Sequence, residues 1–185
     1  RAGRADSVGN VEGITDLTAA DLTAVGDQVV VLDKAAPALR TTRGSAQLER
    51  AERVQVQQPG PAADAVAVAL PDGYAFVPLA GGTFDTIPLG ATAGTPAPPA
   101  VVAGCTYLAW GGSGVYVRDC EGDADDVRQE VDRIRSASAL SFRVNRDVVV
   151  LNDMVNGTVF LVNDDMRAID DWKPVDTQVT EQEDH

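Results

Sequence analysis

Apolar residues alternate with other residues in four short runs spaced evenly along the chain. The runs are 28–33 (QVVVLD), 65–70 (AVAVAL), 106–110 (TYLAW) and 147–152 (DVVVLN), and their starts lie 37, 41 and 41 residues apart. Each is followed by a second extended run, and these start at Ala38, Tyr74, Val115 and Thr158, which are 36, 41 and 43 residues apart. Short runs of this kind predict β-strands. Both sets of landmarks share a period of about forty residues.

Turn residues separate the two runs of each pair. Pro71-Asp72-Gly73 in the second pair and residues 111–114 (GGSG) in the third are rich in residue types that adopt positive φ at little cost. In the fourth pair, Asn156-Gly157 is a strong signal for a two-residue type I′ hairpin. A longer loop from Asn152 to Gly157 would preserve the same side-chain parity, and the sequence leaves both options open.

Further β-rich segments flank the paired runs, at 83–89, 99–104, 139–145 and 166–172. Four short strands per unit with this period are the sequence signature of a β-propeller blade. We therefore predict an all-β fold, a β-propeller segment of about four four-stranded antiparallel blades. The predicted blades are 16–56, 57–90, 96–134 and 139–172, with an N-terminal flank at 1–15 and an acidic linker or tail at 173–185.

A β-sandwich is the alternative, because its short strands are also separated by regular turn signals. A sandwich explains the strands but not the longer period. Segment 125–134 is ambiguous, since Val127, Val131 and Ile134 have the spacing of a short amphipathic helix. The propeller prediction requires an outer strand in this segment.

Ring closure is the open question for a chain with four blades. A propeller avoids exposed sheet edges by completing its ring, and rings larger than four are commoner. The chain begins with Arg1 instead of Met, so we expect it to be the last part of a larger ring within a longer protein. The isolated segment should then expose an apolar blade face and self-associate.

The net charge of −13 and the isoelectric point near 4.3 argue against nucleic acid and against an acidic membrane surface as partners. At 44% apolar residues, the chain can build a core. No apolar run approaches the roughly 20 residues that span a bilayer, and no signal-peptide pattern opens the sequence.

Cys105 and Cys120, the two cysteines of the chain, bracket the third hairpin. With GGSG as a four-residue loop, Trp110 pairs with Val115, and counting back places Cys105 opposite Cys120. Directly opposed residues of antiparallel strands are close enough for a disulfide, which argues for an extracytoplasmic location. The alternative is two buried free thiols in a cytosolic protein. A metal pair fits poorly, because the spacing is not C-x-x-C.

Three stretches carry a resemblance to a known family: 59–82 (PGPAADAVAVALPDGYAFVPLAGG), 102–120 (VAGCTYLAWGGSGVYVRDC) and 139–172. They resemble the N-terminal, β-propeller-like extracytoplasmic region of large actinobacterial surface proteins that contain fibronectin type III or Ig-like domains. In that family a membrane anchor precedes the propeller region, and fibronectin-like or Ig-like modules follow it. The resemblance implies a cell-surface location and no activity of particular residues.

The sequence offers little that could support catalysis. His185, the one histidine, lies in the charged tail, so a nucleophile–histidine triad has no base. No glycine-rich phosphate loop is present, and paired carboxylates for glycoside hydrolysis are expected by chance among 28 acidic residues. We therefore assign no catalytic, cofactor-binding or metal-binding residue and expect no cofactor and no enzyme.

Two features could instead bind a ligand. The acidic loops after the third and fourth hairpins, at 121–126 and 163–165, have oxygen ligands suited to Ca²⁺, although solvated loop charge explains them better. Tyr107, Trp110 and Tyr116 could form an exposed aromatic strip for sugars or peptides, or pack between blades.

These observations predict a non-enzymatic, extracytoplasmic scaffold or protein-interaction module of a bacterial cell-surface protein. Its partners would be other domains of the same protein, or extracellular proteins or glycans. The alternatives are a glycan-binding accessory domain or a fragment of a polysaccharide-active enzyme, and a cytosolic protein–protein adaptor.

Overall fold

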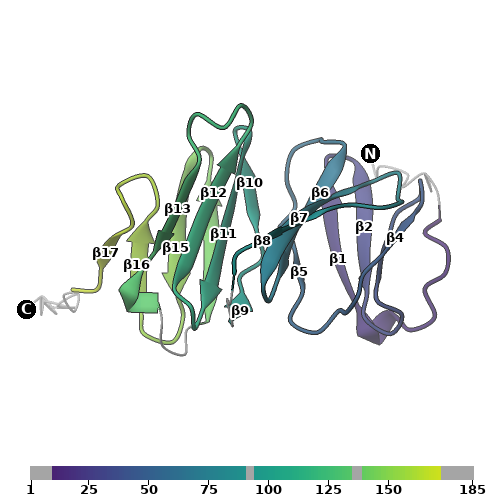
Figure 1. Ribbon diagram of the computed structural model, residues 1–185, viewed down its shortest axis with the longest axis horizontal. Helices are drawn as coiled ribbons and strands as arrows, with labels where there is room; N and C mark the ends of the chain where they lie inside the picture. Colours follow the sequence, from purple (N-terminus) through teal and green to yellow (C-terminus); the bar gives the residue numbers. More distant parts are fainter. Residues whose placement is uncertain (1–9, 91–93, 135–138, 172–185) are drawn as a thin grey trace, which may run out of the picture.

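The computed structural model of the protein describes residues 10–90, 94–134 and 139–171, and the structural statements below refer to these residues. Four antiparallel sheets follow one another along the chain and stand in a row in Figure 1, from the purple first sheet to the yellow-green last one. The predicted tail at 173–185 lies outside the described residues, as does most of the predicted flank at 1–15.

The strands of each sheet are consecutive in sequence and adjacent in space. The first sheet contains β1 (Ala20–Val25), β2 (Gln28–Asp33), β3 (Ala38–Arg40) and β4 (Ser45–Gln47), after the short 3-10 helix η1 (Leu17–Ala19). The second contains β5 (Gln55–Val56), β6 (Ala65–Leu70), β7 (Gly73–Pro78) and β8 (Thr86–Pro88). The third contains β9 (Thr95–Pro96), β10 (Ala100–Val102), β11 (Cys105–Gly111), β12 (Val115–Cys120) and β13 (Val127–Glu130), followed by η2 (Asp132–Ile134). The fourth contains β14 (Leu140–Asn145), β15 (Val148–Asp153), β16 (Thr158–Leu161) and β17 (Arg167–Ile169).

This architecture confirms the predicted all-β, propeller-like fold and contradicts the sandwich alternative, which has two layers instead of four successive sheets. Two details differ from the predicted blades. Gln55 and Val56, expected at the end of the first blade, form β5 and pair with β6 of the second sheet. In the third sheet, β9 is an additional strand that pairs with β11. The ambiguous segment 125–134 supplies the outer strand β13, and its last residues form η2.

The fourth hairpin uses the longer of the two loops that the sequence left open. Asp153 pairs with Thr158, so the two-residue Asn156-Gly157 turn does not form. The side chain of Asp153 explains this choice, because its Oδ1 accepts hydrogen bonds from the backbone N–H groups of Val155 and Asn156 at 3.0 and 3.2 Å. Asp33 closes the first hairpin in the same way, with 3.0 Å bonds from two successive backbone N–H groups.

Apolar side chains fill the three interfaces between consecutive sheets. Alternate residues of a strand point to opposite faces, so a central strand of the second or third sheet contributes to two interfaces. Val30, Leu32, Val66 and Val68 pack between the first and second sheets. Leu108 and Trp110 fill the second interface, and Phe142 and Phe160 fill the third.

The array is open at both ends. No core cluster of the described residues joins the first sheet to the fourth. Leu22 and Val29 are 68% and 48% exposed on the outer face of the first sheet, and Val148 is 59% exposed on the fourth. Each end sheet therefore presents apolar side chains to solvent.

Backbone hydrogen bonds tie the innermost segments of the sheets together. Gly26 donates to the carbonyl of Gly60 at 3.0 Å, and Gly60 donates to Ala24 at 3.1 Å. Gly26 has a φ of 61°, and a Cβ at this position would lie 2.8 Å from the Cβ of Ala62. Gln58 bonds to two further sheets, from its backbone N–H to the Pro99 carbonyl at 2.7 Å and from Nε2 to the Phe142 carbonyl at 2.9 Å.

Candidate functional site

The predicted disulfide forms at the ends of β11 and β12. Cys105 and Cys120 are directly opposed in the register, with their Cα atoms 4.0 Å apart. A disulfide fits an oxidising environment of the extracellular kind. None of the helices in the described residues is both long enough and apolar enough to span a membrane.

The three aromatic residues considered as a ligand-facing strip are all buried. Tyr107, Trp110 and Tyr116 are 7%, 0% and 2% exposed. Tyr107 packs toward Phe142 of the fourth sheet, with ring centroids 6.4 Å apart. The structure therefore favours packing between blades over an exposed binding strip, because sheet neighbours cover both faces of the third sheet.

Trp110 is the centre of the second interface. Its ring lies 6.5 Å from that of Tyr74, and its Nε1 donates to the carbonyl of Leu70 at 2.7 Å. Tyr116 faces the fourth sheet instead, where its hydroxyl has no hydrogen-bond partner among the described residues and burial raises its pKa. Both residues serve the core.

The acidic loops do not converge on one point. In the described residues, no group of three or more His, Cys, Asp or Glu side chains is arranged to hold a metal ion. Asp126 has a local role, because its Oδ1 accepts a 2.7 Å hydrogen bond from the backbone N–H of Cys120. This contact holds the chain beside the disulfide.

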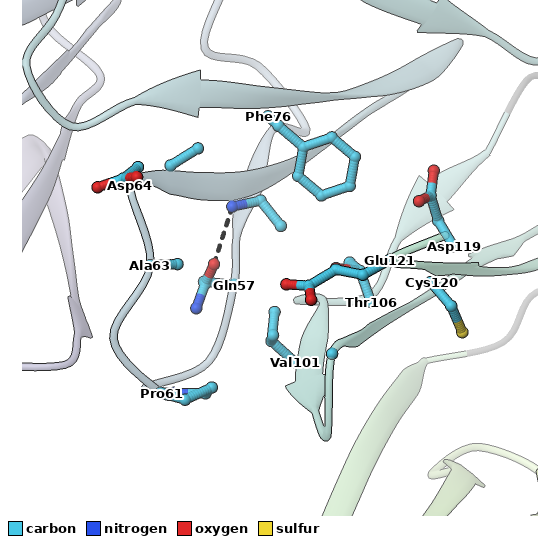
Figure 2. Close-up of a pocket in the computed structure, with 13 residues that line it drawn as sticks. Gln57, Pro61, Ala63, Asp64, Phe76, Val101, Thr106, Asp119, Cys120 and Glu121 are labelled. Carbon is cyan, nitrogen blue, oxygen red and sulfur yellow. Dashed lines mark hydrogen bonds between the residues drawn. The ribbon is translucent and has the colours of Figure 1, made fainter. Parts of the chain in front are cut away.

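A cleft of about 340 Å³ opens between the second and third sheets, at the disulfide end of the interface. Figure 2 shows its walls: Phe76, Asp64 and Gln57 from the second sheet and its connecting loop, and Thr106, Asp119 and Glu121 from the third. The spacing of strands and turns in the sequence does not predict this cleft.

An enlarged connection in the second sheet forms one side of the cleft. In the other three sheets, the turn after the innermost paired strand has two residues, as the pairs Val25–Gln28, Val102–Cys105 and Asn145–Val148 show. In the second sheet, residues 57–64 separate β5 from β6, and four of them line the cleft. Loops that are longer than the connection between two strands requires often carry functional residues.

Small side chains explain why the interface is hollow here. Strand β6 directs Ala65, Ala67 and Ala69 toward the third sheet, while its valines face the first. Trp110 and Tyr74 fill the space beside Ala69. Beside Ala65 and Ala67 the third sheet offers only Thr106 and Asp119, which are too small to close the gap. The alternation AVAVAL contained this signal, since one face of the strand is entirely alanine.

The charge on the cleft is negative. Asp64, Asp119 and Glu121 line it, no Lys, Arg or His does, and none of the three carboxylates has an ion-pair partner among the described residues. Asp119 Oδ2 accepts a 2.7 Å hydrogen bond from the hydroxyl of Tyr74. Burial and this hydrogen bond raise the pKa of Tyr74, so its hydroxyl keeps its proton and remains a donor at neutral pH.

Thr106 adds an unsatisfied polar group to the wall of the cleft. Its side chain lies on the face toward the second sheet and is 6% exposed, and its hydroxyl makes no hydrogen bond with the described residues. Gln57, also buried, is better satisfied: its Oε1 accepts from the backbone N–H of Ala67 at 2.8 Å. Because this hydroxyl faces the cleft, it is not fully buried, and water or a ligand can reach it there.

A second cleft, of about 450 Å³, lies along β8 and the connection from β4 to β5. Its charges are mixed, and Arg50 already pairs with Asp72 at 3.5 Å. The first cleft is therefore the stronger candidate, because its charge is of one sign and unpaired.

Comparisons with known proteins support the fold and leave the function open. No protein-family model matches the chain, and no curated protein matches it either. One similar solved structure is the crystal structure of a catalytically inactive variant of virginiamycin B lyase from Staphylococcus aureus with quinupristin. The TM-score is 0.61 at 13% sequence identity, over 83% of this chain and 55% of that one.

That neighbour is a β-propeller, so the likeness shows the fold. At this identity its lyase activity does not transfer to the present chain. The chain spans about half the length of the propeller that it matches.

Proposed function

We propose that this segment is a non-enzymatic, extracytoplasmic scaffold or protein-interaction module of a bacterial cell-surface protein of the fibronectin type III kind. The observation that carries the proposal is the open array of sheets. Among the described residues, each end sheet carries exposed apolar side chains on its outer face, such as Leu22 and Val148, and such side chains pack against a further layer. We propose that further propeller blades cover them, supplied by the rest of the protein or by a second copy.

Two other observations support this role. The Cys105–Cys120 bond suits an extracytoplasmic setting, and the resemblance to actinobacterial surface proteins supplies the cell-surface assignment and the membrane anchor. The likeness covers only 55% of a longer propeller, which agrees with further blades beyond these four.

The glycan-binding alternative is weaker because the three aromatic residues considered as its platform are buried. Sugar binding by stacking needs exposed rings, and Trp110, Tyr107 and Tyr116 are buried in the interfaces.

Sedimentation velocity of the full 185-residue chain tests the end faces. We expect concentration-dependent association, because the Leu22 face of one copy can cover the Val148 face of another. Leu22→Asp and Val148→Asp should each shift the chain toward monomer, since a buried unpaired charge opposes the contact. Ile87→Asp is the matched control, because Ile87 is 38% exposed on an outer strand away from both end faces, and it should leave association unchanged.

A chain that stays monomeric at every accessible concentration would contradict the claim that these faces pack against further sheets. If all three variants weakened association equally, the association would be non-specific, and this result would contradict the claim as well.

A further inference from the structure

The cleft beside the disulfide is suited to one kind of ligand. We propose that it binds an arginine or lysine side chain of a partner polypeptide. This inference rests on the proposed interaction function and names the chemistry of one partner contact.

Charge is the first argument. Three carboxylates, of Asp64, Asp119 and Glu121, surround the cleft, and no basic side chain of the described residues neutralises them. A cation that enters can form charge-assisted hydrogen bonds with more than one of them. The net charge of −13 adds long-range attraction for a basic partner.

The hydroxyl of Thr106 is the second, independent argument. Thr106 as a whole residue is only 6% exposed, and its hydroxyl, on the wall of the cleft, has no protein partner among the described residues. It therefore offers a hydrogen-bond acceptor at the wall, where a guanidinium or ammonium group can donate.

The lining of the cleft suits an organic cation better than a metal ion. The carboxylates are spread around the cleft and do not form a set that could hold a metal ion. Ala63, Ala65, Ala67 and Pro61 make the surface between them apolar, which suits the methylene stem of a long basic side chain. The ring of Phe76, 36% exposed, lines the same cleft as Asp119 and Glu121 (Figure 2) and can stack on a cation.

The cleft is also held in shape before any ligand arrives. Gly60 and Gln58 bond the enlarged loop to the first, third and fourth sheets. Across the cleft, the disulfide at Cys120 and the 3.0 Å bond from the Glu121 N–H to the Gly104 carbonyl fix the opposite wall. A preformed site loses little entropy on binding.

Isothermal titration calorimetry of the full chain tests the inference with three acetylated, amidated peptides that differ in one central residue: arginine, citrulline or glutamate. We expect saturable binding of the arginine peptide. The citrulline peptide, which keeps the shape without the charge, should bind about tenfold more weakly. The glutamate peptide should not bind.

Variants locate the binding in the cleft. Glu121→Gln and Asp64→Asn each remove one exposed charge, and each should weaken the arginine peptide about threefold to tenfold. Thr106→Val keeps the shape of the side chain and should weaken binding of the arginine peptide by a similar factor. Asp147→Asn is the matched control, because it makes the same charge change at an exposed turn of the fourth sheet. It should leave the affinity unchanged.

Several results would overturn the inference: equal binding of the three peptides, no binding of the arginine peptide, or a loss in Asp147→Asn as large as in Glu121→Gln. If N-acetylarginine amide binds as tightly as the peptide, the site takes a free cation and the partner assignment is wrong. Saturable binding of a neutral oligosaccharide, lost in Phe76→Ala, would favour the glycan alternative instead. None of these results alters the sedimentation test, so the two proposals can fail separately.

Discussion

Replacing Trp110 with alanine should lower the free energy of unfolding by about 3–5 kcal/mol, as for other large buried aromatics. Trp110 is fully buried between the second and third sheets, where its ring fills the space that Ala69 leaves. The variant would leave a cavity there and would also free the carbonyl of Leu70, which now accepts from the indole Nε1 at 2.7 Å. Urea unfolding, monitored by far-UV circular dichroism, measures the change.

Two further variants separate the contributions at this position. Trp110→Phe keeps most of the apolar volume and loses the hydrogen bond. It should therefore lower the free energy of unfolding clearly less than Trp110→Ala does. Phe76→Ala removes an aromatic ring that is 36% exposed at the cleft and should cost about 1 kcal/mol or less. If Trp110→Ala were no more destabilising than Phe76→Ala, the packing assigned to the second interface would be wrong.

Removing the disulfide should destabilise the protein by about 3 kcal/mol on the chain-entropy estimate, because the bond closes a loop with a sequence separation of 15 in the unfolded chain. For a chain of this size, that corresponds to a fall of roughly 6–12 °C in Tm. The double variant Cys105→Ala, Cys120→Ala measures the effect by thermal unfolding without reductant.

The reduced native chain is the control for this pair of substitutions. If the loss comes from the open loop, the reduced chain and the double variant should unfold at similar temperatures, well below the oxidised chain. Thiol titration of the oxidised chain should find both cysteines blocked. Two free thiols, or a double variant as stable as the oxidised chain, would contradict the account of the third sheet.

Much of the fold could be read from local sequence because side-chain alternation and turn residues act over short distances. The loop from Gly111 to Gly114 and the alternation around it were enough to place Cys105 opposite Cys120, and the register confirms this. Details that depend on contacts between residues distant in the sequence, or on competing contacts, were harder to predict from the sequence. Gln55 and Val56 belong to the second sheet because they pair with Ala69 and Val68 of β6, which no local pattern shows.

Side-chain hydrogen bonds also decided features that backbone propensity left open. Asn156-Gly157 has the composition of a two-residue turn, yet the bonds that Asp153 accepts favour the longer loop. The cleft depends on what stands opposite Ala65 and Ala67 in the next sheet. The alanine face could be read from the sequence, but the partner that fails to fill it, Thr106, could not be assigned before the sheets were placed.

The order of the sheets is the central claim, and nuclear Overhauser contacts between aromatic side chains test it most directly. The account predicts contacts between Tyr74 and Trp110 across the second interface and between Tyr107 and Phe142 across the third. It predicts none, in dilute monomer, between the Leu22 face of the first sheet and the Val148 face of the fourth. Contacts between those two faces would show a closed ring, and loss of the Tyr107–Phe142 contact would show a layered sandwich. Either result would contradict the open array.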